Sequence, residues 1–104
     1  MIYKVKIMPP AQRQLEKYIA YTKNTLKNPD AAKSIAADAR KTKQKLSEVA
    51  GSLKLCEDER LARHGYRIIH FEHHKFYMIY RINDDTVSVD FMLHELQDID
   101  NIIV

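Results

Sequence analysis

Glycine, proline, cysteine and tryptophan are all scarce in this chain of 104 residues, which contains 2 Gly, 3 Pro, 1 Cys and no Trp. Low glycine and proline, together with 45% hydrophobic residues, exclude a disordered or low-complexity chain. The single cysteine, Cys56, cannot form an internal disulfide. No window approaches the roughly 18 consecutive apolar residues that a membrane span requires.

The sequence also indicates the cellular compartment of the protein. The N-terminus lacks the basic segment and long apolar run of a secretory signal, and a lone cysteine is typical of a reducing compartment. We therefore expect a cytoplasmic protein with no membrane partner. The length predicts one domain over residues 1–104, with no room for a second.

Charge is distributed unevenly along the chain. The formal net charge is +3, but residues 1–54 hold 12 Lys and Arg against 4 Asp and Glu, a balance of +8, whereas residues 55–104 hold 5 against 10, a balance of −5. Such asymmetry indicates a charged face or a charged partner.

The first half predicts one strand and two helices. Residues 1–8 alternate as a half-buried strand does, and Pro9-Pro10 then ends that strand and opens a helix. Apolar residues recur every three or four positions from Ala11 to Leu26. Asn28-Pro29-Asp30 suits the start of a second helix, which we expect to end in a left-handed cap at Gly51. The two helices should form an antiparallel hairpin.

The second half predicts a connection over Ser52–Gly65 and then three strands, Tyr66–Glu72, Lys75–Ile82 and Thr86–His94. A turn at Asn83-Asp84 would place Tyr77 opposite Asp90 and His73 opposite His94. The alternation predicts that one face of the last two strands is the core. Its members are Phe76, Met78, Tyr80, Ile82, Val87, Val89, Phe91 and Leu93.

The first of these three strands is ambiguous, because either Tyr66 and Ile68 or Ile69 and Phe71 could face inward. The predicted fold class is α+β in the order β-α-α-β-β-β. Its helical hairpin packs on one side of a mainly antiparallel four-stranded sheet.

The order of elements and several short motifs resemble the RelE/ParE superfamily of toxins from type II toxin–antitoxin modules. The resemblance spans nearly the whole chain. It is carried by Gly65-Tyr66-Arg67-Ile68, by Tyr80-Arg81-Ile82-Asn83-Asp84-Asp85, by Val87, Val89 and Leu93, and by His94 followed four residues later by Asp98.

This resemblance implies a protein that arrests bacterial growth and is neutralised by a cognate antitoxin. RelE-like members cleave mRNA on the ribosome with basic and aromatic residues on an open sheet face, whereas ParE-like members inhibit DNA gyrase. The family pattern implies that Tyr66 and Ile68 are in the core, so that Arg67 joins Tyr77, Arg81 and His94 on that open face. The sequence leaves the choice of target open, and a non-toxic binding module that keeps only the fold is the alternative.

Cleavage of RNA without a metal would need an acid or base and cations around the phosphate. The candidate catalytic residues are His94 as acid or base, Arg67 as phosphate ligand and Tyr77 as a base-stacking or positioning residue. Further candidates for nucleic-acid binding, besides Arg67, are Arg81, His73 and Lys75.

Each of these residues also has a purely structural interpretation. His94 would end a strand, Arg67 would form a surface ion pair, Tyr77 would pack beside Asp90, and Arg81 would pair with Asp84 or Asp85.

Several other features of the sequence define the expected partners. RelE-like nucleases usually have a second basic residue where this chain has Ile69 and an arginine near the position of Tyr77, which weakens the nuclease interpretation. The histidines lack the ligand spacing of a metal site, so we expect neither metal nor cofactor. On the basic second helix, Arg40, Lys41 and Lys45 are candidates for binding an acidic partner, with an ordinary solvated helix face as the alternative.

Overall fold

The computed structural model describes residues 2–97 and 99, and Asp98 therefore lies outside the described residues. The elements, in chain order, are β1 (Lys4–Ile7), α1 (Pro9–Ala20), a π-helical turn (Tyr21–Thr25), α2 (Pro29–Val49), a 3₁₀ turn (Ala50–Ser52), α3 (Glu59–Arg63), β2 (Arg67–His70), β3 (Phe76–Asn83) and β4 (Thr86–His94). None of the described helices is long and apolar enough to cross a membrane.

The helical hairpin begins and turns at the residues that the sequence indicated. Pro9 and Pro10 form the first turn of α1 directly after β1, where a missing backbone N–H costs nothing. Asn28 caps α2, since its side-chain oxygen accepts a hydrogen bond from the Ala31 N–H at 3.1 Å. Between the helices, Lys27 takes a left-handed conformation with φ of 53°.

The predicted left-handed cap at Gly51 is wrong. The chain continues past α2 into the 3₁₀ turn, and the two described non-glycine residues with positive φ are Lys27 and Asp84, while Gly65 is the described glycine with positive φ. Gly51 instead allows a close approach, because a Cβ at this position would collide with the Tyr3 hydroxyl. The glycine therefore lets β1 lie against the end of α2.

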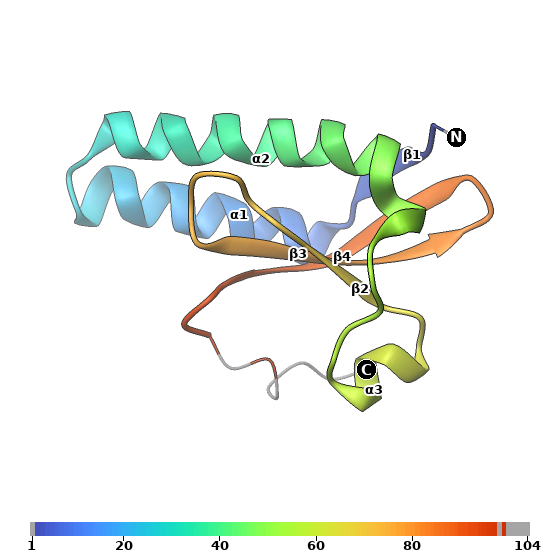
Figure 1. Ribbon diagram of the computed structural model, residues 1–104. Coiled ribbons are helices and arrows are strands. Elements are labelled where there is room, and N and C mark those ends of the chain that lie inside the picture. The colour runs from blue at the N-terminus through green and yellow to red at the C-terminus, as the bar shows by residue number, and fades with distance from the viewer. Residues whose placement is uncertain (1, 98, 100–104) are drawn as a thin grey trace.

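The sheet has the strand order β1-β4-β3-β2, with β1 parallel to β4 and the other pairs antiparallel. This arrangement confirms the α+β fold class. Figure 1 shows α1 and α2 lying side by side along one face of the sheet. The strand pairing closes the N-terminal strand onto the last strand, so both ends of the sequence contribute to the sheet.

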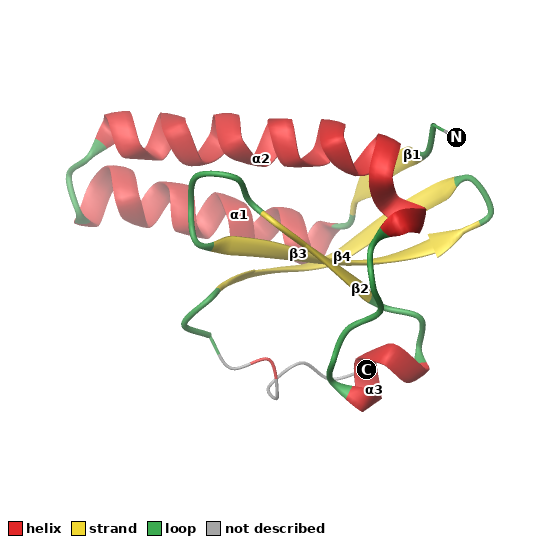
Figure 2. Ribbon diagram, in the orientation of Figure 1, coloured by secondary structure: helices red, strands yellow, loops and turns green. Residues whose placement is uncertain are grey.

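The opposite face of the sheet is not open. The connection after α2 runs along the edge of the sheet, where Leu55 forms an isolated bridge with Arg67, and Figure 2 shows the short helix α3 on the side away from the hairpin. Asp58 caps α3 by accepting hydrogen bonds from the N–H groups of Arg60 and Leu61. The expected packing of the hairpin on one side of the sheet is confirmed, and the connection over Ser52–Gly65 adds a short helix on the other side.

A β-bulge in β4 changes which side chains face the core. The hairpin turn is at Asp84-Asp85, with Asn83 paired to Thr86 and φ of 56° at Asp84, so the predicted turn at Asn83-Asp84 is wrong. The register shifts between Ile79 and Tyr80, whose partners are Phe91 and Val89, which leaves Asp90 as the extra residue.

Beyond the bulge, the register departs further from the prediction. Tyr77 lies opposite Leu93 rather than Asp90, and Phe76 rather than His73 lies opposite His94. Because an inserted residue reverses the alternation, Phe91 and Leu93 turn away from the helices and Met92 turns toward them.

Both faces of the sheet are consequently apolar. We call the cluster against the hairpin the helical-face core; it includes Ile35, Leu46, Ile69, Phe71, Phe76, Met78, Tyr80, Val87, Val89 and Met92. We call the other the outer-face cluster, made of Cys56, Leu61, Tyr66, Tyr77, Ile79 and Leu93. The sequence left open which residues of β2 and its flanks face inward, and in the structure both sets do, on opposite faces of the sheet. Ile69 and Phe71 face the hairpin, whereas Tyr66 and Ile68 belong to or pack against the outer-face cluster.

Candidate functional site

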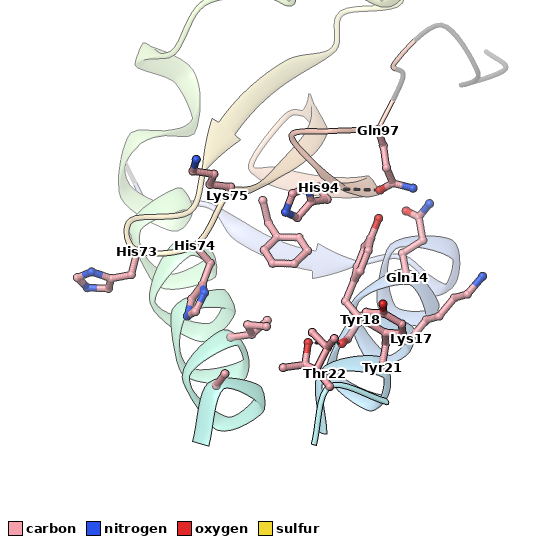
Figure 3. A pocket seen from close by; sticks show the side chains of 14 residues that line it. Gln14, Lys17, Tyr18, Tyr21, Thr22, His73, His74, Lys75, His94 and Gln97 are labelled. Carbon is pink, nitrogen blue, oxygen red and sulfur yellow. Dashed lines mark hydrogen bonds between the residues drawn. The ribbon is translucent and has the colours of Figure 1, made fainter. Parts of the chain in front are cut away.

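The main concave site is a cavity of about 760 Å³ between the turn end of the helical hairpin, the start of β3 and the end of β4. Its lining residues are Gln14, Lys17, Tyr18, Tyr21, Thr22, Leu26, Ala31, Ile35, His73, His74, Lys75, Phe76, His94 and Gln97. Figure 3 shows Tyr18, Tyr21 and Thr22 on one side, facing His74 across the opening. Among the described residues that line the cavity there are two lysines and three histidines, but no aspartate or glutamate.

One buried carboxylate shapes the β2–β3 turn that forms a wall of this cavity. Asp38 on α2 is 2% exposed, and its two oxygens accept backbone hydrogen bonds from Glu72 at 3.3 Å, His73 at 3.0 Å and His74 at 2.8 Å. Three successive N–H groups aimed at one carboxylate fix the turn on the helix. His73, His74 and Lys75 are therefore held beside the hairpin.

Sequence reasoning missed Asp38, although a signal was present. Asp38 lies three residues after Ile35 and four before Thr42, on the stripe of α2 that faces the core. A charged residue at a core-facing helical position needs a buried partner. Its partners are backbone groups, which the sequence does not mark.

Hydrogen bonds with the residues that follow β4 fix the position of His94. The His94 N–H donates to the Gln97 side-chain oxygen at 3.0 Å, and the Leu96 N–H donates to His94 Nδ1 at 3.1 Å. Because Nδ1 is an acceptor, the neutral imidazole carries its proton on Nε2. The ring also stands perpendicular to Phe76, with centroids 5.0 Å apart.

Two aromatic side chains that line the cavity, Tyr18 and Phe76, are in direct contact. Tyr18 packs edge to face on Phe76 at 4.9 Å between ring centroids. Burial raises the pKa of the Tyr18 hydroxyl, and its hydrogen bond with the His94 backbone partly offsets this effect. The Tyr18 hydroxyl is therefore neutral at ordinary pH.

The other histidines of the cavity differ in their surroundings. His74 Nε2 lies 2.9 Å from the Ser34 hydroxyl, which links the turn to α2. His73 lies at the outer rim, where Figure 3 shows its ring pointing away from the centre, and its Nε2 is 4.0 Å from a Glu72 carboxylate oxygen. In the described part of the chain, no group of three or more His, Cys, Asp and Glu side chains could hold a metal ion.

The structure thus brings three of the predicted site residues, His94, His73 and Lys75, to one cavity. It separates them from Arg67, Tyr77 and Arg81. Arg67 lies opposite Tyr80 on the helical face, and its guanidinium donates to the Leu53 carbonyl oxygen. The expectation that Arg67 shares an open face with Tyr77, Arg81 and His94 is wrong, because β2 presents its alternate residues to two different cores.

Tyr77 and Arg81 lie on the outer face of the sheet. Tyr77 is 7% exposed within the outer-face cluster. The Arg81 guanidinium bonds to the Asp90 carboxylate at 2.9 Å, not to Asp84 or Asp85 as the sequence indicated.

The bulge residue Asp90 organises a polar network on the same face. Its carboxylate accepts hydrogen bonds from the Tyr66 hydroxyl at 2.7 Å and from Ser88, while Arg81 lies 4.9 Å above the Tyr66 ring. Burial, followed by the hydrogen bond to Asp90, raises the pKa of Tyr66 to about 12. Arg81 is therefore part of a structural network that pins the bulge.

The candidate partner-binding residues Arg40, Lys41 and Lys45 are exposed along α2. Arg40 also borders a second groove of about 280 Å³ between α1 and α2, whose lining includes Leu15, Ile19 and Ala39. The basic half of the sequence thus lies mainly on the hairpin.

The sequence over residues 5–99 matches the profile of a family described as the ParE toxin of the type II toxin–antitoxin system parDE. Since that match covers nearly the entire chain, this protein belongs to the ParE toxin family. It is a toxin of a type II toxin–antitoxin system, and the sequence resemblance to the RelE/ParE superfamily is confirmed.

Two solved structures share the fold. The chromosomal ParDE system from P. aeruginosa aligns with a TM-score of 0.73 and 17% sequence identity, over 89% of this chain and 96% of that one. The RelBE2 toxin–antitoxin complex from Mycobacterium tuberculosis aligns with a TM-score of 0.60 and 22% identity, over 90% and 99%. No curated protein sequence matches this chain. Both neighbours come from toxin–antitoxin systems.

Proposed function

We propose that this ParE-family toxin arrests bacterial growth by inhibiting DNA gyrase and that binding of a cognate antitoxin relieves the arrest. Such a target is in the bacterial cytoplasm. The observation that carries the proposal is the division of the nuclease candidates between two faces of the sheet: Arg67 faces the hairpin, whereas Tyr77 is buried on the opposite side. Groups that act together on one phosphate must converge on it.

The test is expression of the toxin alone, followed by a supercoiling assay with purified gyrase. We expect growth arrest that an antitoxin from the same operon relieves, and dose-dependent loss of supercoiling. Normal growth at confirmed expression would instead favour a non-toxic binding module.

The second candidate function is metal-independent cleavage of mRNA on the ribosome. It is favoured by the convergence of His94, His73 and Lys75 on one cavity. In this hypothesis His94 is the catalytic acid or base, and Arg67 and Tyr77 contribute only if the RNA reaches around the sheet.

The variant His94→Ala separates the two functions. Under gyrase inhibition it leaves growth arrest and supercoiling inhibition intact. Under mRNA cleavage it abolishes both cleavage on ribosomes and growth arrest. His70→Ala is the matched control, since His70 is an exposed histidine outside the cavity.

Arg40, Lys41 and Lys45 are proposed as an electrostatic contact for the acidic part of a partner. Reversal of all three charges should slow association with that partner and reduce its dependence on salt. An unchanged association rate at low salt would assign these residues to an ordinary solvated helix face.

A further inference from the structure

The part of the cavity next to the end of β4 is lined by polar side chains from two distant segments. Gln14 and Tyr18 lie four residues apart on α1, so they share one face of that helix. His94 ends β4, and Gln97 follows it closely in the chain. All of these residues line the cavity, and Figure 3 shows the ends of the Gln14, Tyr18 and Gln97 side chains next to His94.

Backbone N–H groups fix the orientation of the two glutamine side chains. The Met92 N–H donates to Gln14 Oε1 at 2.9 Å, and the His94 N–H donates to Gln97 Oε1 at 3.0 Å. A backbone N–H can be satisfied only by an acceptor, so both amide oxygens are committed to β4. The side-chain NH₂ groups of Gln14 and Gln97 are therefore the polar groups that can meet a ligand.

The imidazole and the phenol beside them act as donors as well. The Leu96 N–H donates to His94 Nδ1 at 3.1 Å, so the neutral ring offers its Nε2–H to the cavity. The Tyr18 hydroxyl oxygen accepts from the His94 backbone, which leaves the hydroxyl proton able to donate. We call Gln14, Tyr18, His94 and Gln97 the donor end of the cavity, because the backbone engages an acceptor atom of each.

A group of donors with their acceptors engaged complements a carboxylate. An ionised carboxylate only accepts hydrogen bonds, and its two oxygens accept about four. None of the described lining residues is acidic, and Lys17 and Lys75 extend their amino groups outward from the rim in Figure 3. None of the described lining residues is arginine, the side chain that best matches the double charge of a phosphate monoester. The site therefore favours a singly charged anion.

The rest of the cavity suits an aromatic body. Tyr18 and Phe76 meet edge to face at 4.9 Å between ring centroids. Tyr21 is 52% exposed at the opening, so its ring can pack against an aromatic group of a ligand. The remaining apolar lining is aliphatic, from Leu26, Ala31 and Ile35. The volume of about 760 Å³ lies within the range of small-molecule sites.

We propose that this cavity binds a small aromatic carboxylate, with the carboxylate held at the donor end and the aromatic body packed against Tyr21 and the aliphatic lining. Lys17 and Lys75 attract the anion from the rim. The site gives the toxin a small-molecule ligand in addition to its protein partners. It does not depend on whether the target of the toxin is gyrase or mRNA, so the inference goes beyond the proposed function.

Phenylbutyrate is the probe for the test, and its primary amide is the matched neutral control. Titration calorimetry with the purified toxin should give a Kd of roughly 0.1 mM for the carboxylate. The amide should bind about tenfold more weakly or worse, because its NH₂ group meets donors. In NMR spectra, phenylbutyrate should shift the side-chain amide signals of Gln14 and Gln97. The signal of Gln44, which is exposed on α2 outside the cavity lining, should not move.

Two substitutions change the donor end without removing its backbone contacts. Gln14→Glu keeps an oxygen for the Met92 N–H, and Gln97→Glu keeps one for the His94 N–H. Each exchanges an NH₂ donor for a negatively charged acceptor, so each should weaken phenylbutyrate binding by about tenfold or more. Gln44→Glu adds the same charge elsewhere and should bind the probe as the unsubstituted protein does. Thermal melting checks that each variant folds.

Absence of binding at about 10 mM phenylbutyrate would overturn the proposal. Equal affinities for the acid and its amide, or unchanged affinity in both glutamate variants, would overturn it as well. If adenosine monophosphate binds more tightly than phenylbutyrate, the cavity is a nucleotide site and the proposal is wrong. These measurements use purified protein, so failure of the toxin to arrest growth would refute the proposed function alone.

Discussion

Replacement of Asp38 is the sharpest test of how the cavity is built. The Asp38→Ala substitution removes the acceptor for three backbone N–H groups of the β2–β3 turn, those of Glu72, His73 and His74. A hydrogen bond to a charged group contributes about 1.5–3 kcal/mol. The three bonds share one carboxylate, and water can reach the exposed turn, so their energies do not add fully.

We expect Asp38→Ala to lower the free energy of unfolding by about 3–4 kcal/mol. That loss is a large part of the roughly 5–15 kcal/mol typical of a domain and corresponds to a melting temperature lower by roughly 15 °C or more. Asp38→Asn should cost about half as much, since one amide oxygen can still serve the two shorter bonds, to His73 and His74.

Urea unfolding followed by far-UV circular dichroism gives these energies, and hydrogen exchange at the Glu72, His73 and His74 amides locates the effect. Glu48→Ala is the control, because Glu48 is an exposed carboxylate on the same helix, and its change should stay within about 0.5 kcal/mol. A loss below about 1 kcal/mol for Asp38→Ala would refute the reasoning, as would equal losses for the alanine and asparagine variants.

Three further outcomes concern two buried side chains, Tyr66 and Cys56, and the glycine that lies against the Tyr3 side chain. The pKa of Tyr66 is raised from 10.0 to about 12, so the stability that its neutral form contributes is complete below pH 10.0 and declines as the pH rises toward 12; Tyr66→Phe should flatten this decline in urea titrations. Burial raises the pKa of the Cys56 thiol to about 11, so native protein should resist iodoacetamide at neutral pH, and rapid alkylation without urea would contradict its burial. Gly51→Ala should lower the free energy of unfolding by about 1–3 kcal/mol through its collision with the Tyr3 hydroxyl; Tyr3→Phe should recover part of that loss, and equal losses in both backgrounds would rule out the collision.

The sequence determined those parts of the fold that depend on neighbouring residues. Pro9-Pro10 ends β1 and opens α1 because proline fixes φ and lacks an N–H. Asn28 caps α2 because its side chain reaches an amide three residues ahead. Alternation in the second half revealed three strands, and this order of elements together with short motifs was enough to indicate the family.

The local sequence pattern did not determine which side chains of those strands face which side of the sheet. Phe91 and Leu93 continue the alternation of Val87 and Val89, as residues of the same core face would, yet the bulge at Asp90 turns them to the outer-face cluster. A bulge is a property of two paired strands, and both faces of this sheet are covered, so either assignment buries apolar side chains. For the same reason, the expected site wrongly grouped Arg67 and Tyr77, which lie on different faces of the sheet.

The candidate site was likewise only partly present in the sequence. His94, His73 and Lys75 could be named as chemically capable residues, since histidine and lysine titrate or carry charge wherever they lie. Their meeting with Tyr18 and Tyr21 depends on Asp38, which holds the β2–β3 turn against α2 across 34 to 36 residues of sequence. Local periodicity thus determined the elements of the fold, and the resemblance of their order and short motifs to a known family indicated the class of protein. The tertiary structure alone decided the cavity, because contacts between distant segments form only when the whole sheet and hairpin pack together.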